Sequence, residues 1–149
     1  LQETKRYGTT ENSASGYRLF FSGDCSGVKG RKGQHRVGLA TKEEIVKKAG
    51  EDGITIECIS ARLLKTRISI KSNFVTFVVA YSPIEEAPEG QKGKYIEALN
   101  CTVASVPARQ YVFVLTDANT RTGKRGEGGG ETDIKVLGAY GRDKLNKNG

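Results

Sequence analysis

The clearest hydrophobic pattern in the chain lies at residues 111–115, where five apolar or aromatic residues follow one another and the run ends at Thr116 and Asp117. A short apolar run bounded by a polar turn predicts a strand that is buried on both faces. Residues 74–80 form a second run, rich in β-branched residues, which ends at Tyr81. The pattern therefore predicts interior strands with polar residues at their exits.

Shorter stretches with alternating or locally apolar patterns, each bounded by turn residues, predict further strands at residues 16–23, 37–40, 54–59 and 62–70. Their succession favours antiparallel hairpins in sheets that stack face to face. The polar stretch at residues 5–15 is rich in Gly, Ser, Thr and Asn, which predicts a loop.

Two helices are predicted between these strands. Residues 42–49, followed by Gly50, predict a short helix. In residues 88–103, apolar residues recur at a spacing of three and four, as on the buried face of a longer helix. Because this helix separates the strands at 74–81 and 111–115, the unit predicts a crossover and a sheet that is partly parallel.

Polar residues at the ends of the predicted strands are candidate functional residues. Asp117 and Asn119 are two residues apart, so on an extended backbone both project to one side and could converge on a phosphate or a water. The alternative is an ordinary turn in which both side chains bond their own backbone. Glu3 and Tyr81 follow what look like two further strand ends, which predicts one polar rim.

Composition limits the class of protein. The chain has 149 residues, one domain's worth, and a net charge of +7, which favours a polyanionic partner over a merely soluble basic surface. It contains no apolar run of membrane-spanning length and no signal-peptide pattern, so we expect an intracellular protein without membrane contact. Three widely spaced cysteines and one histidine indicate neither a disulfide framework nor a zinc site.

Two glycine-rich, cationic segments, at residues 24–36 and 120–130, could follow a nucleic-acid backbone. A solvated surface loop is the alternative for both. The candidate nucleic-acid contacts in these segments are Arg31, Lys32, Arg36, Arg121, Lys124 and Arg125.

Three short motifs together resemble successive blocks of the endonuclease/exonuclease/phosphatase family: residues 1–4 (LQET), 79–83 (VAYSP) and 115–119 (LTDAN). Residues 16–23, 60–64 and 138–142 narrow the resemblance to the endonuclease domain of RTE-type non-LTR retrotransposons and to craniofacial development protein 2-like proteins. The resemblance implies an α/β (α+β) fold, a four-layered sandwich with mixed, mostly antiparallel sheets.

The same resemblance implies a phosphodiesterase that nicks DNA with Mg²⁺, or with Mn²⁺ in its place, and needs no small-molecule cofactor. Glu3 would bind the metal, and Asp117 would align or deprotonate the attacking water. Asn119 would hold the scissile phosphate, and Tyr81 would donate a hydrogen bond to its non-bridging oxygen. A hard cation and a pentacovalent phosphate fit such oxygen ligands and donors. A retroelement enzyme of this kind would act in the nucleus.

The chain differs from the family pattern in two substituted positions and in the strands that it lacks. Thr116 and Ala118 stand where family members carry glycine and a large apolar or aromatic residue. The family's first strand, with an asparagine, and its last strands, with an Asp and an Asp-His pair, have no counterpart in residues 1–149. We therefore expect a partial domain, truncated at both ends. The alternative function is an inactive, domesticated or decayed copy that binds nucleic acid or protein.

Overall fold

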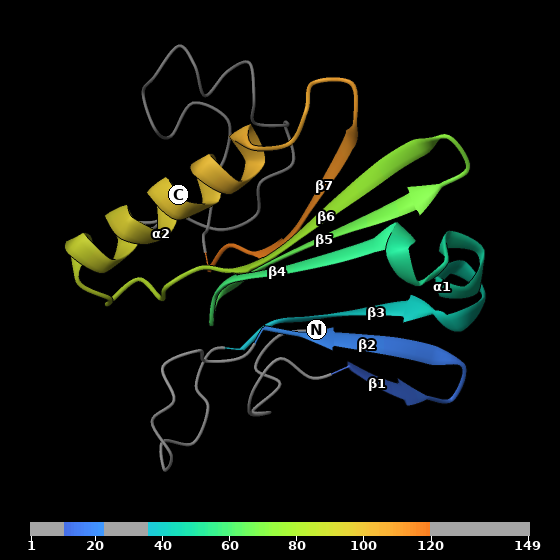
Figure 1. The fold of residues 1–149 in the computed structure, drawn as a ribbon. Helices are drawn as coiled ribbons and strands as arrows, with labels where there is room; N and C mark the ends of the chain where they lie inside the picture. The colour runs from blue at the N-terminus through green and yellow to red at the C-terminus, as the bar shows by residue number, and fades with distance from the viewer. Residues whose placement is uncertain (1–10, 23–35, 120–149) are drawn as a thin grey trace, which may run out of the picture.

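The computed structural model describes residues 11–22 and 36–119 (Figure 1). These residues form two α-helices, one 3₁₀ helix and seven strands, and the strands are arranged in two sheets. In chain order the elements are β1 (Glu11–Ala14), β2 (Tyr17–Phe21), β3 (Gly38–Lys42), α1 (Glu43–Ala49), η1 (Glu51–Gly53), β4 (Ile54–Ser60), β5 (Leu63–Ile70), β6 (Asn73–Tyr81), α2 (Glu89–Ala104) and β7 (Tyr111–Asp117).

The smaller sheet is antiparallel, in the order β1-β2-β3. Its first strand corrects the sequence prediction, because residues 11–14 belong to β1 and not to a loop. The turn between β1 and β2 has positive φ at Ser15 (51°) and Gly16 (80°), as a tight hairpin requires. A polar edge strand of this kind forms through its turn and its pairing with β2. Its sequence therefore lacks the alternation of apolar and polar residues that would predict a strand.

The larger sheet has the order β4-β5-β6-β7. Its first three strands are joined as antiparallel hairpins, whereas β6 and β7 run parallel with α2 as the connection between them. A parallel pair needs a long crossover, and the sixteen residues of α2 supply it. The predicted crossover and the mixed, mostly antiparallel sheet are both confirmed.

The sheets and helix α2 form stacked layers (Figure 1), and two clusters of buried side chains lie between them. Between the two sheets, Phe20 and Leu39 from the small sheet meet Leu64 and Val79 from the large one. On the other face of the large sheet, the second cluster joins Leu63, Val78 and Ala80 to Tyr95 of α2. The predicted α+β sandwich is confirmed, and the described residues supply a helix layer and two sheet layers.

The burial of β7 differs from the sequence prediction. Its apolar residues are exposed, from 38% at Val112 to 67% at Tyr111, although they were expected to be buried on both faces. Within the described residues β7 pairs only with β6, and α2 packs over β5 and β6. The apolar run identified the strand correctly, but a run of this kind cannot tell how many layers and neighbours cover it.

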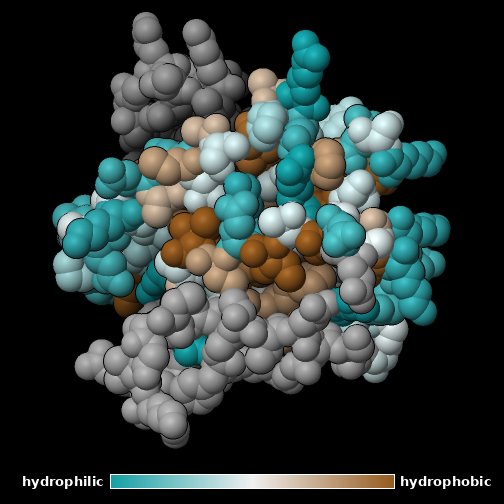
Figure 2. Space-filling model, in the orientation of Figure 1, coloured by the Kyte–Doolittle hydropathy of each residue, from teal (hydrophilic) through white to brown (hydrophobic). Residues whose placement is uncertain are grey.

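The opposite edge of the large sheet is also partly apolar. Ile56 and Ile59 of β4 are 38% and 43% exposed. Figure 2 shows hydrophobic side chains gathered near the middle of the face turned to the viewer, where β4 runs in Figure 1. The Cys58 thiol of the same strand donates to the Phe21 carbonyl at 3.6 Å, so this strand also contacts the small sheet.

Gly38 provides a test of how closely the small sheet is packed. A Cβ atom at this position would lie 2.7 Å from Phe21 Cδ1 and 2.8 Å from the Phe20 carbonyl oxygen. Because one of these neighbours is backbone, we expect Gly38→Ala to lower the free energy of unfolding by about 1–3 kcal/mol in urea denaturation.

Gly93 is the matched control, because a Cβ there meets nothing within 4 Å and the residue lies inside α2. Gly93→Ala should raise the stability by about 1 kcal/mol, since alanine favours the helix. Equal effects of the two substitutions would contradict the packing of Gly38 against β2.

Candidate active site at the carboxyl ends of β6 and β7

Tyr81 and Asp117 are the last residues of two neighbouring parallel strands and are paired in register. Residues paired in a parallel ladder project to the same face, so both side chains lie on the side of the sheet that faces the small sheet. The ladder continues one step further, because Ser82 N donates to Asp117 O at 3.0 Å. Tyr81 is 8% exposed and Asp117 is exposed, so the pair joins the core to the surface.

Asn119 completes a tight turn after β7. Its backbone N–H donates to Asp117 Oδ1 at 3.0 Å, and its φ is 45°. Asparagine tolerates this left-handed conformation better than most residues. The turn interpretation of Asp117 is therefore correct as local structure, but a carboxylate has two oxygens and several lone pairs and can accept further bonds.

The side chain of Asn119 reaches the end of the neighbouring strand. Its Nδ2 donates to the Ser82 carbonyl at 2.8 Å, which ties the exit of β7 to the exit of β6. The sequence predicted that Asp117, Asn119 and Tyr81 share one rim, and the structure brings these three residues together. The rim is thus made by hydrogen bonds between segments 37 residues apart in sequence.

Arg62 belongs to the same cluster, although it was not among the predicted site residues. It lies in the turn between β4 and β5, and its Nη1 donates to the carbonyls of Tyr81 and Ser82, both at 3.2 Å. Its Cζ lies 5.2 Å from the centre of the Tyr81 ring. Burial lowers the pKa of Arg62, and the neighbouring tyrosines Tyr81 and Tyr95 oppose that shift.

Arg62 lies within the motif at residues 60–64, but the sequence gives it no role, because its partners are 19 and 20 positions away and only the fold brings them close.

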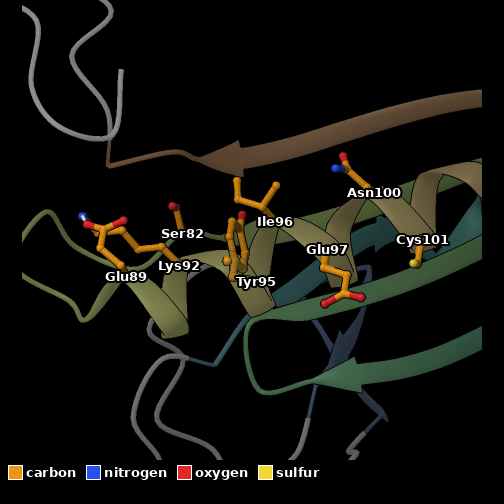
Figure 3. Close-up of a pocket in the computed structure, with 9 residues that line it drawn as sticks. Ser82, Glu89, Lys92, Tyr95, Ile96, Glu97, Asn100 and Cys101 are labelled. Carbon is orange, nitrogen blue, oxygen red and sulfur yellow. Dashed lines mark hydrogen bonds and ion pairs between the residues drawn. The ribbon is translucent and has the colours of Figure 1, made fainter.

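Tyr95 connects α2 to the same strand ends. Its side chain is 8% exposed, and burial raises the pKa of Tyr95, whereas a hydrogen bond with Thr116 acts in the opposite direction. Beside it lies an open cavity of about 620 Å³, lined by α2 and Ser82. Figure 3 shows Ile96 and Asn100 projecting from α2 on the side of β7. The cavity therefore adjoins the rim but is formed mainly by the helix.

Several predicted site residues lie outside the described residues: Glu3, Arg31, Lys32, Arg121, Lys124 and Arg125. Arg36 is described, and the structure corrects the prediction for it. Its side chain is only 3% exposed, so it does not present its guanidinium to a nucleic-acid backbone. The glycine-rich, cationic pattern around Arg36 indicated surface, but Arg36 directly precedes the buried Val37 and β3.

A metal ion would need more ligands than the described rim offers. Within residues 11–22 and 36–119, no three His, Cys, Asp or Glu side chains are grouped closely enough to hold one. Asp117 supplies one carboxylate at this rim, whereas Mg²⁺ prefers several oxygen ligands in octahedral geometry. The described residues alone therefore do not fit a complete magnesium site.

Neither protein-family models nor curated proteins identify a family for this chain, so a proposal for its function rests on the geometry of the site. No protein-family model matches the chain, and no curated protein is significantly similar to it. Among the described helices, none has the length and apolar character needed to cross a membrane.

Proposed function

We propose that this chain forms part of the active site of a phosphodiesterase that nicks DNA, as the endonucleases it resembles do. The nick would expose a 3′-hydroxyl for target-primed reverse transcription by a retroelement in the nucleus. The observation that supports this proposal best is the in-register pairing of Tyr81 with Asp117 at the ends of β6 and β7, with Asn119 bonded to both strand exits.

Each of these side chains suits one part of phosphodiester hydrolysis. The exposed Asp117 carboxylate can orient a water and accept its proton. The Tyr81 phenol can donate to a non-bridging oxygen of the phosphate, and the Asn119 amide can hold the same group in place. Because the three lie on one rim fixed by backbone hydrogen bonds, little reorganisation is needed when a phosphate binds.

The proposal includes Mg²⁺ because the family resemblance implies that Glu3 binds it, and Glu3 lies outside the described residues. A divalent ion would supply charge for the phosphate oxygens when bound, and Mn²⁺ could take its place. Because the described residues contain no group of three side chains that could hold a metal ion, the roles above concern proton transfer and hydrogen bonding by the chain's own residues.

The second candidate is a module that binds nucleic acid or protein without catalysis. Two observations favour it: Asp117 accepts a bond from its own turn, and the Asn119 amide bonds a backbone carbonyl. Both contacts give the polar side chains a structural role. The exposed apolar residues of β7 are also a feature of surfaces that bind partners.

The test uses the chain expressed with any coding sequence that continues its reading frame. Supercoiled plasmid is incubated with the protein and Mg²⁺, Mn²⁺ or EDTA, and a DNA polymerase then tests whether the nicks carry 3′-hydroxyls. The phosphodiesterase predicts nicks that depend on the metal and prime synthesis. Salt-sensitive DNA binding without nicks in either metal would instead support the binding module.

A further inference from the structure

We propose that Arg62 is a positioning residue, which holds Tyr81 and Asn119 in the arrangement that the reaction requires. This inference rests on the proposed function, because it assigns to Arg62 the alignment of that site. The observation behind it is that the Arg62 side chain is bonded to the same backbone carbonyl as the Asn119 amide.

Arg62 holds the peptide units on both sides of Tyr81. Its backbone carbonyl accepts a hydrogen bond from Tyr81 N at 3.0 Å, and its side-chain Nη1 donates to Tyr81 O at 3.2 Å. The guanidinium also lies over the Tyr81 ring, with Cζ 5.2 Å from the ring centre, a favourable distance for a cation on an aromatic face. Both the backbone and the ring of Tyr81 are therefore fixed by one residue.

The Ser82 carbonyl extends this control to Asn119. It accepts from Arg62 Nη1 at 3.2 Å and from Asn119 Nδ2 at 2.8 Å. The N–H of the same residue, Ser82, donates to Asp117 O at 3.0 Å. Movement of the Ser82 peptide would thus disturb Asp117 and Asn119 together, and Arg62 holds that peptide from the β4–β5 turn.

The chemistry of the side chain suits this task. A guanidinium has several donors in a planar arrangement and stays charged when partly buried, so it can bond two carbonyls and stack on a ring at once. A lysine could donate to the same carbonyls but would not stack in a plane. An apolar side chain of similar length, such as methionine, would fill the space and make neither contact.

The test compares Arg62→Met and Arg62→Lys with Arg109→Met, which removes an exposed arginine from the turn before β7. The first readout does not depend on catalysis: NMR measures hydrogen exchange of the Asn119 side-chain amide and the resonances of the Tyr81 ring. We expect Arg62→Met to accelerate that exchange by about tenfold or more and to shift the ring resonances, because the Ser82 carbonyl is no longer held. Arg62→Lys should lie between Arg62→Met and the wild type.

The second readout is nicking of plasmid DNA. A positioning role predicts that Arg62→Met lowers kcat by about 10- to 100-fold with KM changed by less than about threefold, since misplaced groups affect the reaction more than binding. Arg62→Lys should recover part of kcat, and Arg109→Met should match the wild type.

The outcomes separate the inference from the proposed function. Wild-type-like NMR spectra and kcat in Arg62→Met would overturn the inference, as would a loss confined to KM. If the wild type itself makes no nicks, the proposed function fails and the NMR readout alone decides whether Arg62 positions the rim. Should Arg62→Met not fold, Arg62→Gln, which keeps a single donor group, replaces it under the same criteria.

Discussion

Asp117→Ala is expected to lower kcat for plasmid nicking by about 100-fold or more, because it removes the carboxylate that would orient and deprotonate the attacking water. The residue is exposed at the end of β7 and is paired with Tyr81 across the ladder, so its loss removes no buried packing. The measurement is the initial rate of conversion of supercoiled to nicked plasmid at saturating DNA.

Asp117→Asn separates the two roles of this side chain. Its amide oxygen can still accept the hydrogen bond from Asn119 N, so the turn is retained, but the amide is not a base. We expect nicking to fall as far as in Asp117→Ala. Asp52→Ala, which removes an exposed carboxylate from η1, should leave the rate unchanged. Full activity of Asp117→Asn would show that Asp117 acts only as a turn residue.

Leu64→Ala is expected to lower the free energy of unfolding by about 2–5 kcal/mol, a large share of the stability of a domain this size. Leu64 is fully buried between the two sheets, where it packs with Phe20 and Val79, so its truncation leaves a cavity. Urea denaturation followed by circular dichroism measures the change.

Ile70→Ala is the matched control, because it truncates an aliphatic side chain on the same strand that is 44% exposed. Its cost should stay below about 1 kcal/mol, as for most surface changes that leave no cavity. If the two substitutions had similar effects, the small sheet would not cover the face of β5 that carries Leu64.

The sequence predicted those elements that depend on local patterns. The apolar runs ending at Tyr81 and Asp117 became β6 and β7, and the three-and-four spacing around Tyr95 became α2. It missed β1, because a polar hairpin strand depends on its turn and its partner. It also misjudged the burial of β7, since coverage depends on which elements pack nearby, and a local pattern contains no such information.

In the candidate site, too, local patterns predicted some residues, whereas residues placed by long-range contacts were missed. That Tyr81, Asp117 and Asn119 share a rim could be predicted, because each follows a strand and parallel strands end at one edge. The contribution of Arg62 could not, since its contacts cross from one hairpin to another. For Arg36, composition suggested a surface cation, whereas its position beside β3 places it in the interior.

The most direct test of the account is an NMR titration of the chain with a short DNA duplex in the presence of Mg²⁺. We expect the largest changes in backbone amide shifts at Ser82, Asp117 and Asn119, where the ends of β6 and β7 meet. Changes confined to β4 or to the outer face of α2, with none at these three residues, would contradict the claim that this rim binds a phosphodiester.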